Sequence, residues 1–275
     1  MSRSQIVPDD AAEGRDEWDR HWALYGEPAE GNPANNYRHR LVMALLGHPG
    51  AGDTIFDIGS GQGELALLLQ QRFPEAAVKG IEYSAEGVQR ARMAAEASGL
   101  RIEFILRDLL EPATVGPTLR SSATFAVCSE VLEHVDDPGL LLRNAAAYLA
   151  PGCRLVVTVP GGPRSAFDRH IGHRRHFAPA GLRHLLEGAG FEVEHVARAG
   201  FPFFNLYRLA VIARGRRLIA DLERAASSDD GGAGAATQGV VLAFFDRAFR
   251  FNMASSPFGW QMVAVGRYVG TDRVR

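Results

Sequence analysis

The segment Thr54-Ile-Phe-Asp-Ile-Gly-Ser-Gly-Gln-Gly-Glu64 carries the strongest fold signal in this chain. It opens with a short apolar run, 54–58, that predicts a buried strand. Glycines at 59, 61 and 63 follow, and they permit a tight turn and let a ligand approach the backbone with no Cβ in the way. From Glu64 to Phe73 the apolar residues take helical spacing. The segment therefore predicts a strand–turn–helix unit with a ligand at the turn.

The same alternation of strand and helix continues along the chain. The predicted strands are 54–58, 77–83, 101–106, 123–128, 154–159, 191–197 and 260–268. The predicted helices are 16–25, 36–46, 64–73, 85–98, 137–149, 179–188, 205–226 and 240–253. Strands that alternate with helices in this way are typical of βαβ units around a parallel sheet. The fold class is therefore α/β.

The charges around the glycine turn indicate which ligand it holds. A dinucleotide fingerprint would need glycine or alanine in place of Glu64, and a phosphate-binding loop would need Lys followed by Ser or Thr. Asp57 and Glu64 flank the turn with no basic residue nearby, which favours a ligand bearing sulfonium and ammonium groups over a pyrophosphate. S-adenosylmethionine is such a ligand. Glu82 supports it, because a carboxylate about 20 residues beyond such a turn can accept both ribose hydroxyls.

Four segments, in order, resemble the motifs of the class I S-adenosylmethionine-dependent methyltransferases. The first motif is matched by 55–64, the ribose-binding turn by Gly80-Ile-Glu-Tyr-Ser84, the adenine-contacting turn by Leu106-Arg-Asp-Leu-Leu110, and the fourth-strand motif by Cys128-Ser-Glu-Val-Leu-Glu-His-Val135. The resemblance implies a doubly wound, seven-stranded, mostly parallel sheet of order 3-2-1-4-5-7-6. It also implies S-adenosylmethionine as the cofactor.

Carried over by position, the resemblance implies that Glu82 binds the ribose hydroxyls and Asp108 accepts from the adenine amino group. Asp108 could instead be only a turn or N-cap residue. The glycine turn would border the methionine part with Ser129 beneath it, and Asp57 would orient the turn or the ammonium group. The expected cofactor-binding residues are Asp57, Gly59, Ser60, Gly61, Gly63, Glu82, Tyr83, Arg107, Asp108, Leu109, Ser129 and Glu130.

Titratable side chains gather where the methyl acceptor is expected. Methyl transfer from a sulfonium is an in-line displacement, so for a hydroxyl acceptor the protein supplies position and a proton acceptor. Histidine, whose ordinary pKa is about 6.5, is a suitable base at neutral pH. The alternatives are that His134 only caps the turn before 136–138 and that the loop 160–179 is merely solvated and basic. The predicted catalytic residues are His134, His173, His176 and Asp168.

The spacing of His170, His173 and His176 raises a metal site, with Asp168 as an oxygen ligand. On a helix, however, the first and third histidines would diverge by about 120°, and Gly172 disfavours a helix. No metal is therefore assigned. A binding site for magnesium or another divalent ion is the hypothesis to test.

The loop also resembles that of a group of bacterial methyltransferases. This group shares an Asp-x-x-x-Gly-His-x-Arg-Tyr/Phe loop and a helical insertion before the last strand, and it often acts on lipid-linked, saccharide or secondary-metabolite acceptors. The ubiquinone-biosynthesis type O-methyltransferases are more distant relatives through Glu130-Val-Leu-Glu-His134. The resemblance covers about 35–270. The matching segments are 158–160, 168, 171–177, 182–191 and 256–260.

Four parts are expected along the chain. They are an N-terminal tail and helical cap, 1–47; the cofactor-binding α/β core, 48–198; a helical insertion, 199–257, with a Ser/Asp/Gly/Ala-rich linker at 227–239; and a last core strand and tail, 258–275. The insertion has apolar and arginine-bearing helix faces, which suit a lid, a membrane contact or a dimer contact, or an ordinary packed subdomain. Arg38 could also meet the methionine carboxylate. The expected substrate-binding residues are Tyr37, Arg38, His134, Arg174, Phe203 and Tyr207.

Composition excludes several other classes of protein. Hydrophobic residues make up 46% of the chain and charged residues 23%, which is ordinary for a globular enzyme. The net charge of −2 gives no overall attraction to nucleic acid. Cys128 and Cys153 lack metal-ligand spacing. No apolar run approaches the roughly 20 residues that span a bilayer, and the N-terminus lacks a signal-peptide core, so a cytoplasmic enzyme is expected.

The leading hypothesis is O-methylation of a small-molecule or lipid-like acceptor with a histidine base. One alternative is C-methylation of an activated carbon in a prenyl or polyketide acceptor, with a divalent metal, where Glu130, Glu133 or a histidine stabilises a cation or takes a proton. A different class is a non-catalytic S-adenosylmethionine-binding regulator, against which the histidine loop argues. Nucleic-acid methylation is disfavoured, because the chain has neither an Asn-Pro-Pro-Tyr-type motif nor a basic domain.

Overall fold

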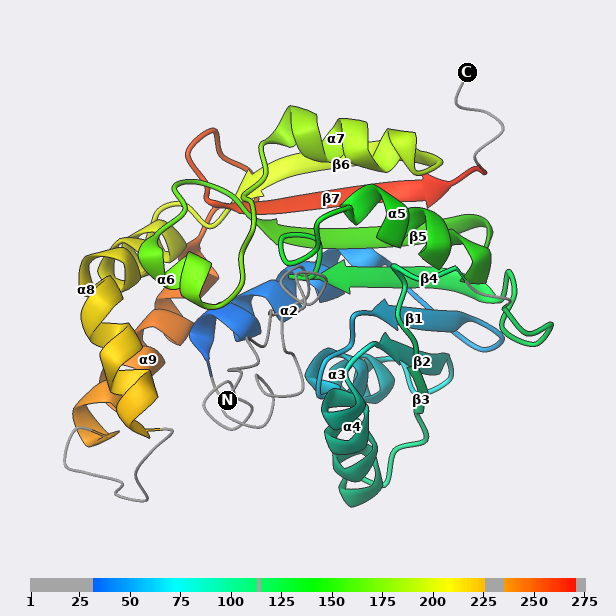
Figure 1. The fold of residues 1–275 in the computed structure, drawn as a ribbon, viewed down its shortest axis with the longest axis horizontal. Helices are drawn as coiled ribbons and strands as arrows, with labels where there is room; N and C mark the ends of the chain where they lie inside the picture. The colour runs from blue at the N-terminus through cyan, green and yellow to red at the C-terminus, as the bar shows by residue number, and fades with distance from the viewer. Residues whose placement is uncertain (1–31, 113–114, 226–234, 271–275) are drawn as a thin grey trace, which may run out of the picture.

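A computed structural model describes residues 32–112, 115–225 and 235–270, which form a seven-stranded sheet with helices on both faces (Figure 1). The strand order is β3-β2-β1-β4-β5-β7-β6, so the predicted order is confirmed. Every neighbouring pair is parallel except those of β7, which runs antiparallel to both β5 and β6. The strands are β1 (Thr54–Ile58), β2 (Ala77–Glu82), β3 (Glu103–Leu106), β4 (Ala123–Ser129), β5 (Leu149–Pro160), β6 (Phe191–Ala199) and β7 (Gln261–Tyr268).

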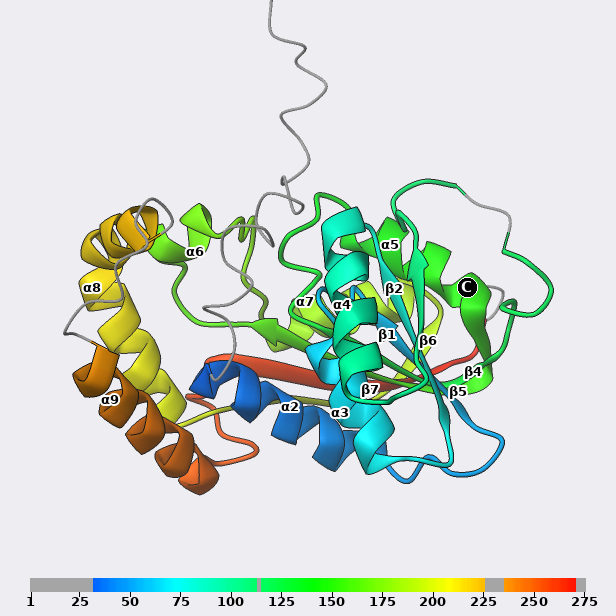
Figure 2. The ribbon, with the colours of Figure 1, turned by 90° about the horizontal axis from the view of Figure 1, so that it is seen from below.

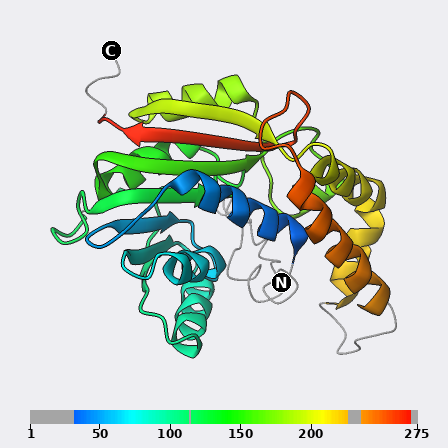
Figure 3. The same ribbon diagram turned by 180° about the vertical axis from the view of Figure 1, so that it is seen from behind.

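Apolar helix faces cover the sheet on both sides, and this is why the central strands are apolar throughout rather than alternating. One face is covered by α2 (Pro33–Leu46), α3 (Glu64–Arg72) and α4 (Ala85–Ala97), and α2 and α3 are seen from behind in Figure 3. The other face is covered by α5 (Pro138–Ala145) and α7 (Pro179–Gly188). Val42 and Leu46 of α2 and Leu182 and Leu186 of α7 are almost fully buried.

Three further helices lie beyond the carboxyl ends of the parallel strands (Figures 1 and 2). They are α6 (Ala166–His170), α8 (Phe203–Ala225) and α9 (Ala235–Ala248), followed by the short 3-10 helix η2 (Phe249–Phe251). An aromatic cluster joins this segment to the core, because the Tyr37 ring of α2 lies 5.4 Å from that of Phe204 and 5.5 Å from that of Phe249. The helices between β6 and β7 are therefore anchored on α2.

Some predicted boundaries are wrong. The helix predicted at 137–149 ends at Ala145, because 146–148 form the 3-10 helix η1 and Leu149 already pairs with Ala123 of β4. Helix α2 begins at Pro33, where Asn32 accepts a hydrogen bond from the Ala34 N–H, rather than at 36. Helix α9 begins at Ala235, inside the predicted linker.

Two predicted segments lie wholly or partly outside the residues that the structure describes. The predicted helix 16–25 and residues 226–234 of the linker lie outside the described residues. Helix α6 lay inside a predicted loop. Within the ranges that the structure describes, no helix combines the length and apolarity required to cross a bilayer.

Candidate active site

The glycine turn between β1 and α3 is held by a carboxylate from the neighbouring strand. Glu82 ends β2 and is 8% exposed. Its Oε2 accepts a hydrogen bond from the Gly61 N–H at 2.9 Å, and its Oε1 accepts one from the Ser84 N–H at 2.8 Å. Glu82 therefore fixes the turn after β1 to the turn after β2, and both turns face the same edge of the sheet.

The last glycine of the turn has a packing reason of its own. Gly63 has φ +87°, a left-handed conformation that other residues adopt only with strain. A Cβ at this position would lie 2.9 Å from the Cβ of Ala91 on α4. Gly63 therefore lets α3 and α4 pack closely, and it is the one predicted cofactor residue that does not line the pocket described next.

A pocket of about 260 Å³ opens at this edge of the sheet, between the glycine turn, α2 and the turns after β2, β3 and β4. It gathers residues that are far apart in the sequence, as expected where parallel strands end. The predicted cofactor residues in its wall are Asp57, Gly59, Ser60, Gly61, Glu82, Tyr83, Arg107, Asp108, Leu109, Ser129 and Glu130. The predicted acceptor-side residues in its wall are Arg38, His134 and Arg174.

The pocket wall is rich in acids. Six carboxylates and three guanidinium groups line it, namely Asp57, Glu64, Glu82, Asp108, Glu130 and Asp136 against Arg38, Arg107 and Arg174. Asp57 is buried, and this burial, together with the nearby Glu82, raises its pKa to about 7. Its Oδ2 receives no hydrogen bond from the described residues. A cation in the pocket would relieve this burial cost, because it would favour the ionised form of Asp57.

Glu130 connects three elements at the back of the pocket. It has φ +56°, which is unusual for a residue with a side chain. Its carboxylate accepts hydrogen bonds from Gln261 Nε2 of β7 at 2.8 Å and from Thr158 Oγ1 of β5 at 3.1 Å. It also pairs with Arg38 Nε of α2 at 3.0 Å. The strained backbone of Glu130 is therefore held by side chains from α2, β5 and β7.

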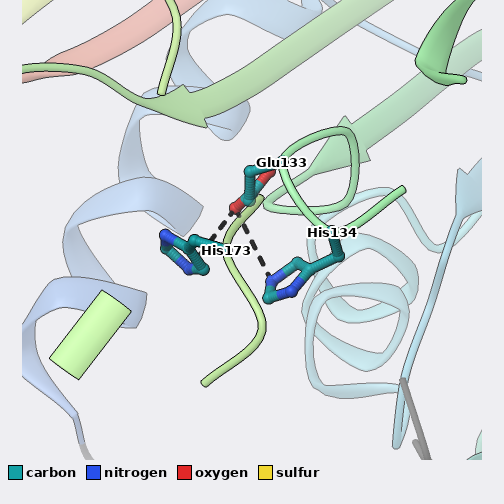
Figure 4. A group of neighbouring side chains, drawn as sticks. All are labelled: Glu133, His134 and His173. Carbon is teal, nitrogen blue, oxygen red and sulfur yellow. Dashed lines mark ion pairs between the residues drawn. The ribbon is translucent and has the colours of Figure 1, made fainter. Parts of the chain in front are cut away.

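An acid–histidine cluster of Glu133, His134 and His173 lies beside this wall (Figure 4). Glu133 is fully buried, and its Oε1 lies 3.9 Å from His134 Nε2 and 4.0 Å from His173 Nε2. Burial, and then the charge of Glu130, raise the pKa of Glu133 well above its usual range. Burial, and then His134, lower the pKa of His173 far below its usual range. Of the three, His134 is the one that lines the pocket.

Arg174 positions the histidine loop against the turn after β4. Its backbone N–H donates to the Glu133 carbonyl at 2.8 Å, and its Nε donates to the His134 carbonyl at 2.6 Å. Its Nη1 pairs with Asp136 at 2.5 Å. Arg174 thus ties two loops together at the rim of the pocket, and its substrate-binding role stays a prediction.

Asp168, predicted to be catalytic, does not line the pocket. It is fully buried, caps α6 through Ser165, and lies 2.8 Å from Arg208 of α8 through both carboxylate oxygens. Burial alone would raise the pKa of Asp168, but Arg208 and Ser165 together bring it below its usual range. The ion pair between Asp168 and Arg208 therefore connects α6 to α8. Each buried charge has an opposite charge as its partner.

His176 and His170 also lie outside the pocket wall. His176 Nδ1 is 3.1 Å from the Gly162 carbonyl, and its Nε2 is 3.3 Å from His173 Nδ1. Burial lowers the pKa of His176 despite its bond to Gly162. His170 is exposed at the end of α6. The loop thus brings two of its three histidines together.

Three predicted substrate-binding aromatics are absent from the pocket wall. Tyr37, Phe203 and Tyr207 belong instead to the apolar cluster between α2, α8 and α9. The ring of Tyr207 lies 5.3 Å from that of Phe245 and 5.7 Å from that of Phe249. Helix α8 turns its aromatic side toward α2 and α9, which the sequence could not indicate because the partner elements were unknown.

Two residues of α2 that line the pocket, Asn35 and His39, were not predicted from the sequence. Burial, and then the neighbouring Arg38 and Arg40, lower the pKa of His39 to about 4. Helical spacing could have found both residues, because 35 and 39 lie on the same helix face as the predicted Arg38.

Comparison with known proteins agrees with this geometry. Residues 33–196, more than half of the chain, match the family described as "Methyltransferase domain". The ubiquinone biosynthesis O-methyltransferase of Aeromonas salmonicida is 29% identical over 174 residues, which cover 58% of this chain and 71% of the relative. That of Xanthomonas euvesicatoria is 28% identical over 207 residues, covering 70% of this chain and 84% of the relative.

A solved structure has the same fold. A putative sarcosine dimethylglycine methyltransferase from Galdieria sulphuraria superposes with a TM-score of 0.59 at 16% identity, covering 92% of this chain and 98% of the other. The fold and the pocket at its strand ends define a Rossmann-like transferase. The chain belongs to the methyltransferase domain family and is a class I methyltransferase.

We expect Glu82→Ala to weaken the binding of S-adenosylmethionine by about 10- to 100-fold. The variant removes a carboxylate from the pocket and releases the Gly61 and Ser84 N–H groups, and hydrogen bonds to charged groups contribute about 1.5–3 kcal/mol. Isothermal titration calorimetry measures the affinity. The matched control is Glu103→Ala. Glu103 is the first residue of β3, at the end of the strand away from the pocket, and its carboxylate pairs with Lys79. Equal affinity in Glu82→Ala and the control would contradict the assignment.

We expect Asp57→Asn to stabilise the ligand-free protein more at pH 8 than at pH 5. The pKa of Asp57 is near 7 in the folded chain and 3.8 when unperturbed, so the folded state binds more protons between these values and loses stability as pH rises. The amide does not ionise, and the gain has an upper bound on the order of 4 kcal/mol. Urea unfolding at both pH values measures it. An equal gain in the free energy of unfolding at pH 5 and pH 8 would contradict a raised pKa of Asp57.

We expect Arg208→Met to lower the free energy of unfolding by about 3–5 kcal/mol, because it leaves the buried Asp168 carboxylate unpaired. The control is Arg143→Met, whose partner Asp137 is exposed and 3.7 Å away. Exposed pairs contribute about 1 kcal/mol or less. Denaturant unfolding of both variants provides the comparison, and equal small losses would show that the α6–α8 ion pair is not stabilising.

Proposed function

We propose that this chain transfers the methyl group of S-adenosylmethionine to a hydroxyl oxygen of a small-molecule acceptor. One observation carries the proposal: His134 lies in the wall of the same pocket as Glu82 and the glycine turn. A single pocket therefore offers a carboxylate for the donor's ribose and an imidazole for the acceptor's proton. The curated relatives named as O-methyltransferases support oxygen as the acceptor atom.

The charges in the pocket wall suit the donor. S-adenosylmethionine carries a sulfonium and an ammonium group, and acids outnumber arginines in the wall. The buried Asp57 carboxylate has an oxygen that accepts no bond from the described chain and could receive such a cation. Asp108 lies in the wall and its Oδ1 accepts from the Leu110 N–H at 2.7 Å, so it shapes the turn that would meet the adenine.

The reaction is an in-line displacement. The acceptor oxygen forms a bond to the methyl carbon as the carbon–sulfur bond breaks, and the sulfur keeps the electron pair to give S-adenosylhomocysteine. The hydroxyl proton must leave for the oxygen to attack well, and an imidazole such as that of His134 is suited to take it. Positioning supplies much of the remaining acceleration, because both reactants are held in one site.

The acceptor that we propose has an apolar part. Apolar side chains complete the pocket wall, namely Leu65, Ile81, Leu109, Leu110, Val131, Val135 and Leu141. The segment between β6 and β7 exposes large apolar side chains as well, namely Leu206, Leu209, Phe244, Phe251, Met253 and Phe258. The exposed Arg247 and Arg250 lie among them in the sequence. Such a surface suits contact with an anionic membrane that carries a lipid-like acceptor, or with a second copy of the chain.

We expect His134→Ala to lower turnover by 100-fold or more while the affinity for S-adenosylmethionine stays within a factor of about three. General bases typically contribute about 10²–10⁴-fold. A screen of hydroxylated aromatic and lipid-like acceptors with labelled donor gives the rate, and mass spectrometry of the product locates the methyl group. The matched control is His184→Ala, an exposed histidine on α7. Normal turnover in His134→Ala would remove the histidine from the mechanism, and a methyl group on carbon would favour C-methylation instead.

A further inference from the structure

This inference rests on the proposed function and concerns how the hydroxyl beside His134 loses its proton. It starts from Glu133, which is fully buried. Neither of its carboxylate oxygens receives a hydrogen bond from the described residues. An unpaired buried carboxylate costs several kcal/mol, so folded proteins neutralise such a group with a proton or a cation. Two histidine nitrogens lie about 4 Å from Glu133 Oε1, close enough to share a cation with it.

Hydrogen bonds assign the tautomers of the loop histidines. The Gly162 carbonyl can only accept, so His176 Nδ1, 3.1 Å away, carries the hydrogen. In the neutral ring His176 Nε2 is then an acceptor, and it receives the hydrogen of His173 Nδ1 across 3.3 Å. His173 Nε2 therefore presents a lone pair, and it faces Glu133 Oε1 at 4.0 Å. A lone pair directed at a carboxylate oxygen is an arrangement that a shared cation stabilises.

A third ligand atom completes the set. His134 Nε2 lies 3.9 Å from the same Glu133 oxygen, and the His134 and His173 rings meet edge to face at 4.8 Å (Figure 4). The three ligand atoms lie within 4.8 Å of one another. Bonds of about 2.0–2.2 Å to zinc place tetrahedral ligands roughly 3.4 Å apart. The separations of 3.9 and 4.0 Å therefore need to close by about half an ångström, and the third separation is at most 4.8 Å.

The neighbouring group of Asp168, His173 and His176 is a poorer site although its atoms are equally close. Arg208 already lies 2.8 Å from both Asp168 oxygens and neutralises them. His173 Nδ1 and His176 Nε2 already satisfy each other. This second group serves instead to orient His173, as the outer hydrogen bonds of metal-ligating histidines do.

We propose that Glu133, His134 and His173 bind one divalent transition-metal cation, such as zinc, manganese or iron, beside the part of the pocket wall that His134 forms. Two imidazoles and one carboxylate suit these metals, and three protein ligands leave a position for the acceptor hydroxyl. The hydroxyl bound there releases its proton to solvent more easily, and the resulting oxyanion attacks the methyl carbon. With the cation bound, His134 is a ligand, and the cation takes over from the imidazole in promoting the loss of the proton.

The test uses the full chain, stripped with a chelator and titrated with Zn²⁺, Mn²⁺ and Fe²⁺ by calorimetry, with metal content measured by mass spectrometry. We expect one cation per chain, and at least tenfold weaker binding in Glu133→Gln and in His173→Ala. The matched control is His170→Ala, an exposed histidine of the same loop, which should bind as the wild type does. Co²⁺ added as a probe should give visible absorption bands that Glu133→Gln removes, and thermal melts verify that each variant is folded.

The outcomes separate this inference from the function on which it rests. No cation on the wild type, or equal weakening by His170→Ala, overturns the metal site. If the chelated protein still methylates a hydroxyl acceptor and needs His134, the proposed function stands with His134 as a simple base. If the cation binds as described but no hydroxyl acceptor is methylated with or without it, the metal site stands and the proposed function fails.

Discussion

The parallel pairing of β1 with both β2 and β4 is the constraint on which the site depends. Asp57 is opposite Gly80 on one side and Val127 on the other, so the ends of three strands reach the same edge of the sheet. Glu82 ends β2, and the turns after β1 and β4 carry the glycines and two members of the acid–histidine cluster, Glu133 and His134. A shift of the strand pairing by one residue would turn these side chains to the other face of the sheet, and the pocket would not form.

Of the twelve residues predicted to bind the cofactor, all but Gly63 line the pocket, because the determinants of the glycine turn and of the strand ends are local. Three glycines in a turn, and a carboxylate at a fixed distance after them, follow from backbone geometry and from strand and helix lengths. The strand order came from the family resemblance rather than from periodicity. Short-range patterns therefore predicted the α/β class and the position of Glu82, and the resemblance added the strand order.

The acceptor half was predicted less completely, because its contacts join residues that no pattern links. Asp168 meets Arg208 across 40 positions, and Glu130 meets Gln261 across 131. Asp168 was predicted to be catalytic because it stands among histidines, yet the cation that pairs with it, Arg208, comes from α8. The burial of each side chain could not be predicted either. Nothing in the segment Glu130-Val-Leu-Glu-His134 shows that Glu133 is fully buried whereas Glu130 lines the pocket. Only the packing of β4 against its neighbours separates the two.

The antiparallel strand β7 has a consequence for how the protein is made. During synthesis β5 and β6 emerge first, but they cannot pair with each other because β7 lies between them. The edge of β5 therefore stays open until residue 268 has left the ribosome, and open edges invite pairing with other chains. Gln261, the first residue of β7, also holds Glu130 in the pocket wall. The contact that holds Glu130 in the pocket wall therefore forms only after the last strand of the sheet has been made.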